Sequence, residues 1–65
     1  MIITVDVTNK EVILFDEVNK EIKCEIESPK LVLGMLYELF NLMNEPDYCL
    51  KQIDEYDNII TIGKW

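Results

Sequence analysis

A single helix-forming segment interrupts a chain whose other segments alternate like β-strands. Residues 29–44 are mostly apolar at helical spacing, whereas residues 2–7 and 21–27 alternate between apolar and polar side chains. A helix repeats every 3.6 residues and a strand every two, so the two patterns specify different elements. The sequence therefore predicts an α+β domain in which one helix packs on a sheet.

The predicted strands form a group of three before the helix and a pair after it. They are residues 2–7, 12–15 and 21–27, followed by residues 48–53 and 59–65. Short polar turns join the first three, a pattern typical of an antiparallel meander. In the third strand, alternation predicts that Ile22, Cys24 and Ile26 point inward. The fold class is thus an antiparallel sheet with one helix packed on it, in the order βββαββ.

Local signals fix both ends of the helix. Ser28 is a favoured N-cap residue, and Pro29 suits the first helical position because its missing N–H would be unpaired there. At the other end, Asn44 is followed by Glu45 and Pro46, and the residue before a proline leaves the helical region. These signals predict a helix over residues 29–44.

The apolar surface of this helix is wider than one sheet face needs. Its apolar side chains fill roughly 200° of arc at 100° per residue, whereas a helix packed on a sheet needs a stripe only somewhat wider than about 100°. Three partners could cover the surplus apolar surface: the hairpin formed by the last two strands, a second copy of the chain, or a different protein. Small domains often gain stability by oligomerising, and we expect a homodimer through the helix.

The residue types present exclude most catalytic chemistry. The 65 residues form one domain, residues 1–65, and contain no His and no Arg. The common general base, the common metal ligand and the bidentate phosphate clamp are therefore missing. Two glycines leave no phosphate-binding loop, and the two cysteines are expected to be reduced core thiols. We predict no enzyme, and no catalytic, cofactor-binding or metal-binding residues.

Acidic residues dominate the charge. Thirteen Asp and Glu against six Lys give a net charge of −7, which disfavours direct binding to nucleic acid or to an anionic membrane. No apolar run is long enough to span a bilayer and the first residues do not resemble a signal peptide, so a cytoplasmic location is expected. Glu21 and Glu25 share one side of the third predicted strand with Glu27. This acidic surface either keeps the protein soluble or imitates nucleic-acid phosphates towards a partner with a basic groove.

Four apolar or aromatic residues complete the predicted partner-binding set. Leu36, Phe40 and Met43 belong to the wide apolar arc of the helix. Trp65 ends the sequence, where side chains fray unless something holds them. If the last strand pairs in the sheet, Trp65 is pinned at its edge, and otherwise it is an exposed anchor.

The size, charge and codon bias of the chain together point to one class of protein that it resembles. The chain is rich in Ile, Lys, Asn, Glu, Asp and Tyr and lacks Ala and Arg, which is typical of a low-GC bacterial host or of its phages and plasmids. In these respects the chain resembles the small acidic proteins of phages and mobile elements. The resemblance implies a non-enzymatic, protein-binding inhibitor of a host or defence protein that acts by occlusion, as anti-CRISPR proteins do. The alternative is a structural or assembly subunit whose main partner is itself.

Overall fold

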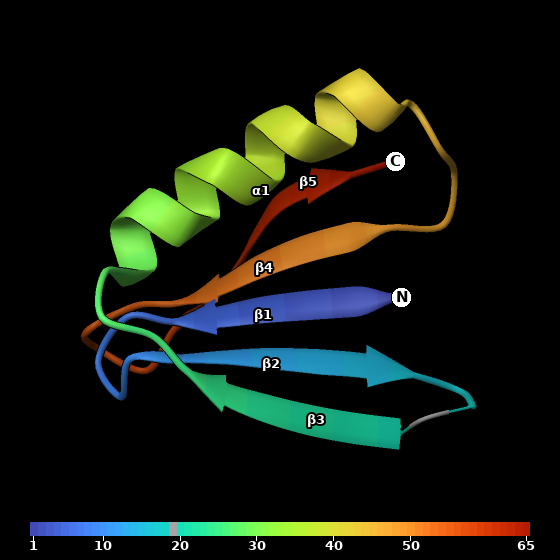
Figure 1. Cartoon of the computed structure of the whole chain (residues 1–65). Coiled ribbons are helices and arrows are strands. Elements are labelled where there is room, and N and C mark those ends of the chain that lie inside the picture. The colour runs from blue at the N-terminus through green and yellow to red at the C-terminus, as the bar shows by residue number, and fades with distance from the viewer. Residues whose placement is uncertain (19) are drawn as a thin grey trace.

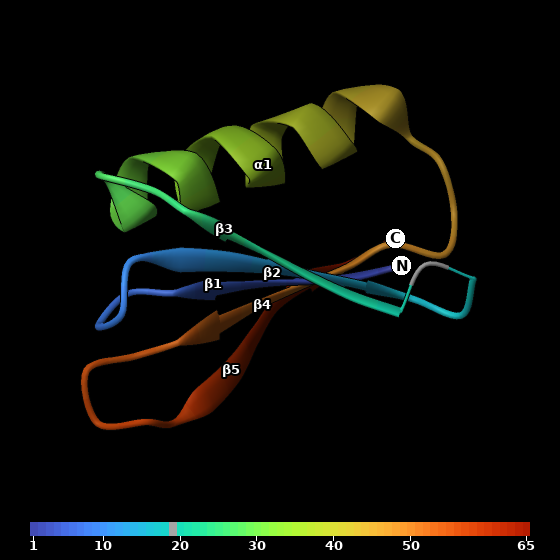
Figure 2. The same ribbon diagram turned by 60° about the horizontal axis from the view of Figure 1, so that its bottom comes forward.

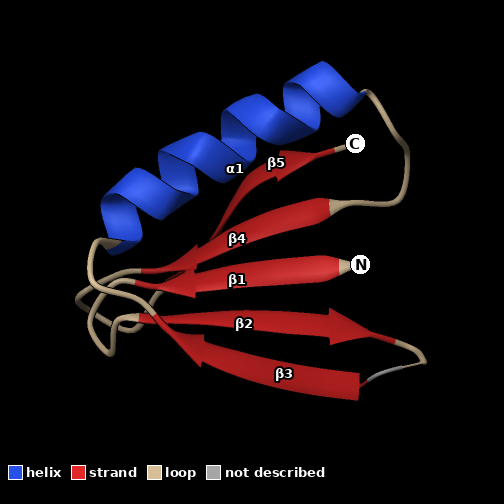
Figure 3. Ribbon diagram, in the orientation of Figure 1, coloured by secondary structure: helices blue, strands red, loops and turns tan. Residues whose placement is uncertain are grey.

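The protein has two layers, one five-stranded sheet and one helix on a single face of it (Figures 1 and 3). The computed structural model describes residues 1–18 and 20–65. The elements are β1 (Ile2–Asp6), β2 (Glu11–Asp16), β3 (Lys20–Glu25), α1 (Pro29–Met43), β4 (Cys49–Ile53) and β5 (Ile59–Lys64). The α+β class and the order βββαββ are thereby confirmed. Asn19, in the predicted turn between the second and third strands, lies outside the described residues.

The sheet is mixed rather than wholly antiparallel. Its strand order is β3-β2-β1-β4-β5, with β1 in the centre. The expected meander of the first three strands is present, and β4 and β5 form an antiparallel hairpin, but β1 and β4 run parallel. The expectation of an antiparallel sheet is corrected at this one pair. The reason is that α1 carries the chain back across the sheet, so the next strand runs in the same direction as β3 and β1.

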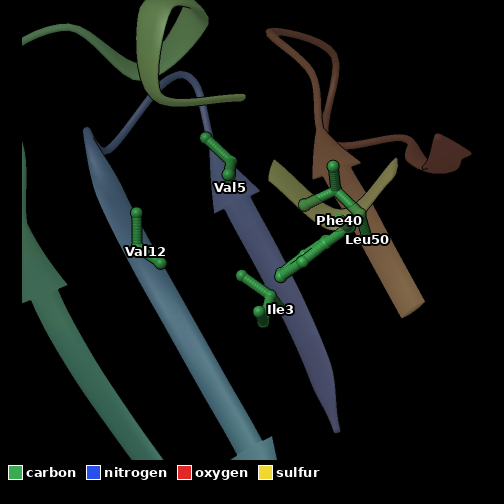
Figure 4. Packing of buried hydrophobic residues seen from close by; sticks show 5 residues of the cluster. All are labelled: Ile3, Val5, Val12, Phe40 and Leu50. Atoms are coloured by element: carbon green, nitrogen blue, oxygen red, sulfur yellow. The ribbon is translucent and has the colours of Figure 1, made fainter. Parts of the chain in front are cut away.

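The core lies between α1 and the middle of the sheet. Figure 4 shows its buried side chains, which are Ile3, Val5, Val12, Phe40 and Leu50. Two of them come from β1, because the central strand is the one that the rest of the protein surrounds. The helix contributes Phe40, which is 5% exposed.

The third strand turns its predicted inward residues to the helix side of the sheet but leaves two of them exposed. In the register, Ile22 lies opposite Leu14 and Cys24 lies opposite Val12, so both are on the helix side of the sheet. However, α1 packs mainly on β1 and β4, and Figure 1 shows β3 at the edge of the sheet far from the helix. Ile22 and Cys24 are therefore exposed, and their predicted burial is wrong. Ile26, just beyond the strand, is half-buried against the core.

The ends of α1 follow the sequence signals closely. Ser28 occupies the N-cap position, where its carbonyl oxygen accepts a hydrogen bond from the N–H of Val32 at 3.1 Å and its side chain makes no capping bond. Asn44 takes a left-handed conformation with φ of 52° and donates its N–H to the Phe40 carbonyl. The helix thus ends at Met43, one residue earlier than predicted.

Candidate protein-interaction surfaces

Two apolar surfaces remain exposed on opposite sides of the domain. The first, which we call the outer stripe, lies on the solvent side of α1 and comprises Leu31, Met35, Leu39 and Leu42. The second, which we call the open face, is the side of the sheet away from α1, with Ile2, Ile13, Phe15, Ile53 and Ile59. The hairpin of β4 and β5 covers neither of them, because it extends the sheet beside β1 (Figure 2). Internal cover by this hairpin, one of the three alternatives, is thus not what the structure has.

The outer stripe follows directly from helical spacing. Positions 31, 35, 39 and 42 fall on one side of a helix, and the four side chains are between 49% and 81% exposed. An open groove of about 750 Å³ runs along them, and Lys30, Gly34 and Glu38 also line it. Leu31 and Leu42 are thus exposed apolar residues with no structural role in the sheet-facing core.

The open face follows from strand alternation. Ile3 and Val5 point towards α1, so Ile2 and Thr4 point the other way. Phe15 lies directly opposite Ile2 in the register, and Ile59 lies opposite Ile53. Phe15 is 47% exposed and Ile59 is 67% exposed. In the described residues no element packs on this side of the sheet (Figure 2), so the pair of Ile2 and Phe15 and the pair of Ile53 and Ile59 are uncovered at opposite corners of it, with Thr4 and Lys51 between them.

Two of the three predicted glutamates border the open face. Glu21 lies opposite Phe15 and Glu25 lies opposite Glu11, so alternation places all four on the same side of the sheet. Lys23, between the two glutamates, lies opposite Ile13 on that side as well. Glu27 follows the strand and is exposed in the loop before α1. The structure therefore brings Glu21 and Glu25 together with an apolar patch and leaves Glu27 apart.

The predicted helix residues belong mainly to the interior. Phe40 is a core side chain and is not available to a partner in the folded domain. Leu36 is half-buried and packs against the core, and Met43 is 38% exposed at the end of α1. The outer stripe was not predicted, because an apolar arc of this width does not show which side of the helix meets the sheet.

Trp65 is held in place rather than offered as an anchor. Its N–H donates to the Tyr48 carbonyl, its indole N–H donates to Asn41 Oδ1 at 2.9 Å, and its own carbonyl accepts from the N–H of Asp47. The ring meets Phe40 edge to face, with centroids 5.2 Å apart. A Cβ on Gly63 would lie 2.6 Å from this ring, so glycine is required beneath it. The last strand pairs, and Trp65 is pinned at the edge.

Asp6 is a buried carboxylate with a structural role. It is 5% exposed and accepts hydrogen bonds from the N–H of Thr8, the N–H of Asn9 and the side-chain amide of Asn9. The backbone hydrogen bond from Asn9 is the main cause that lowers the pKa of Asp6, with help from the other two bonds and the charge of Lys23. This carboxylate fastens the turn between β1 and β2.

The two cysteines lie far apart and on different faces. Cys24 is on β3 on the helix side, whereas Cys49 lies opposite Ile2 on β4 and so belongs to the open side. Three strand spacings separate β3 from β4, about 14 Å at 4.8 Å each. A disulfide between them within one molecule is therefore excluded by distance, and both thiols are free.

The exposures of these thiols predict different reactivities. With single-thiol variants made by Cys24→Ser and Cys49→Ser, we expect Cys24 to react rapidly with a thiol reagent in native protein. Half-buried Cys49 should react several-fold more slowly, because access limits attack on a thiol. Denaturant should remove the difference. If Cys24 were the protected thiol under native conditions, β3 would be covered and its exposed placement would be wrong.

Within residues 1–18 and 20–65, no helical segment has both the length and the apolar character that a bilayer crossing demands. Comparison of the chain with protein-family models, with curated proteins and with solved structures gives no match.

Proposed function

We propose that the protein is a non-enzymatic protein-binding module that acts by covering a surface of another protein. The observation that carries the proposal is the open face, where exposed Phe15 lies beside Glu21 and exposed Ile59 lies on the edge strand at the other side of the sheet. Apolar side chains interspersed with charged, solvated ones are typical of the surfaces at which proteins associate. Such a face excludes water when a complementary surface packs on it, and that exclusion stabilises the complex.

The charge of the chain indicates the chemistry of the target. A net charge of −7 attracts a basic protein over a distance and speeds its association. The target we propose is a protein with a basic groove, such as one that holds nucleic acid, and its class is a host or defence protein. Lys23 and Lys51 on the same face favour acidic residues at matching points of the target.

The test compares the open face with an exposed apolar residue elsewhere. Wild-type protein, the Phe15→Ala/Ile59→Ala variant and Val18→Ala are immobilised and exposed to a lysate of a low-GC bacterium. We expect a basic protein to be retained by wild type and by Val18→Ala, because Val18 is 87% exposed in a turn outside the open face. The Phe15→Ala/Ile59→Ala variant should lose it, since truncation removes the two most exposed apolar side chains of the open face and the contact they make.

Kinetics with the purified target then separate charge from apolar contact. Glu21→Lys with Glu25→Lys should slow association markedly and change dissociation less, because rim charges act mainly by steering. Added salt should slow association of wild type as well. Equal retention by all three immobilised proteins would contradict the proposal.

A second candidate is an assembly subunit whose main partner is itself. The outer stripe favours it, because this surface lies on the helix layer. A second copy of the chain can pack there while the open face, on the sheet layer, stays free.

A further inference from the structure

A column of three residues runs along the solvent side of α1 beside the outer stripe. Lys30, Gly34 and Glu38 follow one another at four-residue spacing and line the same groove as Leu31 and Met35. At 1.5 Å of rise per residue, each charged residue lies about 6 Å along the axis from Gly34. The positive and negative charges are therefore placed symmetrically about the glycine.

Gly34 has no packing partner among residues 1–18 and 20–65 of its own chain. A Cβ built at this position meets no atom within 4 Å, and the residue does not have a positive φ. Glycine in the middle of a helix is destabilising relative to alanine, and nothing in the fold of the monomer requires it. A missing side chain on the solvent side of a helix does allow another backbone to come close.

We infer that α1 pairs with α1 of a second copy of this chain, antiparallel, about a two-fold axis that passes near Gly34. In a two-fold interface every contact occurs twice, with the roles of the two chains exchanged. Lys30 then faces Glu38 of the second copy, and Glu38 faces Lys30 of the second copy. A parallel pairing would bring like charges together at both positions, so the charges select the antiparallel arrangement.

The same axis buries part of the outer stripe. At 100° per residue, Leu31 and Leu42 lie about 60° and 80° around the helix from Gly34, so both reach the second copy. Leu39 lies about 140° from Gly34 and stays outside the contact. The interface involves only one helix from each chain, so we expect a dissociation constant in the micromolar range. The open face stays uncovered in this dimer, and the inference does not depend on what binds there.

The experiment reverses each charge singly and then both together. The molecular mass of wild type, Lys30→Glu, Glu38→Lys and Lys30→Glu/Glu38→Lys is measured by sedimentation equilibrium from micromolar to millimolar concentration. Wild type should approach twice 7.7 kDa. Each single reversal should weaken the dimer by about tenfold, because it turns two attractive pairs into two repulsive ones. The double variant should recover the wild-type affinity, since its charges are exchanged across the axis.

Further variants test the glycine and the competing interface. Gly34→Leu should abolish the dimer by filling the close approach, while circular dichroism shows the helix retained. Phe15→Lys, on the open face, and Val18→Lys, in a turn, should leave the dimer unchanged. A wild-type chain that stays monomeric throughout this range would overturn the inference. So would a dimer that tolerates Gly34→Leu and the single reversals, or one that only Phe15→Lys dissociates, which would place the second copy on the sheet.

Discussion

Phe40→Ala should lower the free energy of unfolding by about 3–5 kcal/mol, as large aromatic truncations in a core do. Phe40 is buried among Ile3, Val5 and Leu50, and its ring stacks on Tyr48 with centroids 5.0 Å apart. At about 0.05–0.15 kcal/mol per residue, a domain of this size has only about 3–10 kcal/mol of stability in total. The variant is therefore expected to keep only part of this stability and to unfold at a much lower urea concentration than wild type.

Urea denaturation followed by circular dichroism measures this effect. The matched control is Leu42→Ala on the same helix, where the side chain is 81% exposed and the expected change is within about 0.5 kcal/mol. Both proteins are compared at a concentration low enough for the chain to be monomeric. Equal midpoints for the two variants would mean that Phe40 is not the centre of the core. A loss of partner binding in Phe40→Ala could then be attributed to a missing contact residue rather than to unfolding.

Asp6→Ala should cost about 2–4 kcal/mol of stability at neutral pH, because three donors in the turn between β1 and β2 lose a charged acceptor. Two of these donors are backbone N–H groups, of Thr8 and Asn9. The other is the Asn9 side-chain amide, 2.9 Å from the Asp6 carboxylate. The carboxylate is nearly inaccessible to water, so the loss falls on partly buried donors that solvent reaches poorly.

The pH dependence of this effect has a definite sign. The hydrogen bonds from Asn9 and Thr8 lower the pKa of Asp6 in the folded protein, so folding favours the ionised form. The stabilisation is present above the unfolded pKa of about 3.9 and is lost as the pH falls through the lower folded value. The stability difference between wild type and Asp6→Asn should therefore shrink as the pH is lowered from 7 to 3.

Asp54→Asn provides the comparison for Asp6. Asp54 accepts similar bonds from Tyr56 and Asn58 in the turn between β4 and β5, and its pKa is lowered too, mainly by the backbone bond from Asn58. Its turn is exposed, so water replaces the lost bonds and the effect should be smaller. If the difference in the free energy of unfolding between wild type and Asp6→Asn did not change with pH, the proposed role of the Asp6 charge would be excluded.

The sequence predicts where the helix and the strands lie along the chain better than it predicts which of them are neighbours in the fold. Alternation and the Ser28-Pro29 start place every strand and the helix, because these signals are local. Strand order and direction depend on where α1 crosses the sheet, which no local pattern encodes, so the parallel pairing of β1 with β4 was not predicted. For the same reason Cys24 was assigned to the interior although its strand lies beyond the reach of the helix.

The same limit applies to the candidate surfaces. Glu21 and Glu25 were placed on one side of their strand by alternation, and the register does put both on the open face, with Glu21 beside Phe15 and Glu25 beside Glu11. The wide apolar arc of α1 marked a surplus of apolar surface, but Phe40 and Leu31 are equally apolar in sequence. Only packing shows that Phe40 faces the sheet and that Leu31 faces solvent.

The central position of β1 has a consequence for folding during synthesis. Its register pairs Ile2 with Cys49 and Asp6 with Ile53, so one side of β1 stays unpaired until β4, more than 40 residues further along the chain, has been synthesised. Until then the meander of β1, β2 and β3 carries an unpaired, apolar edge, which is open to aggregation. Closing so distant a pair also slows folding relative to local contacts. Chains truncated before residue 49 should therefore fail to fold and should aggregate, and the complete domain should form in one late, cooperative step.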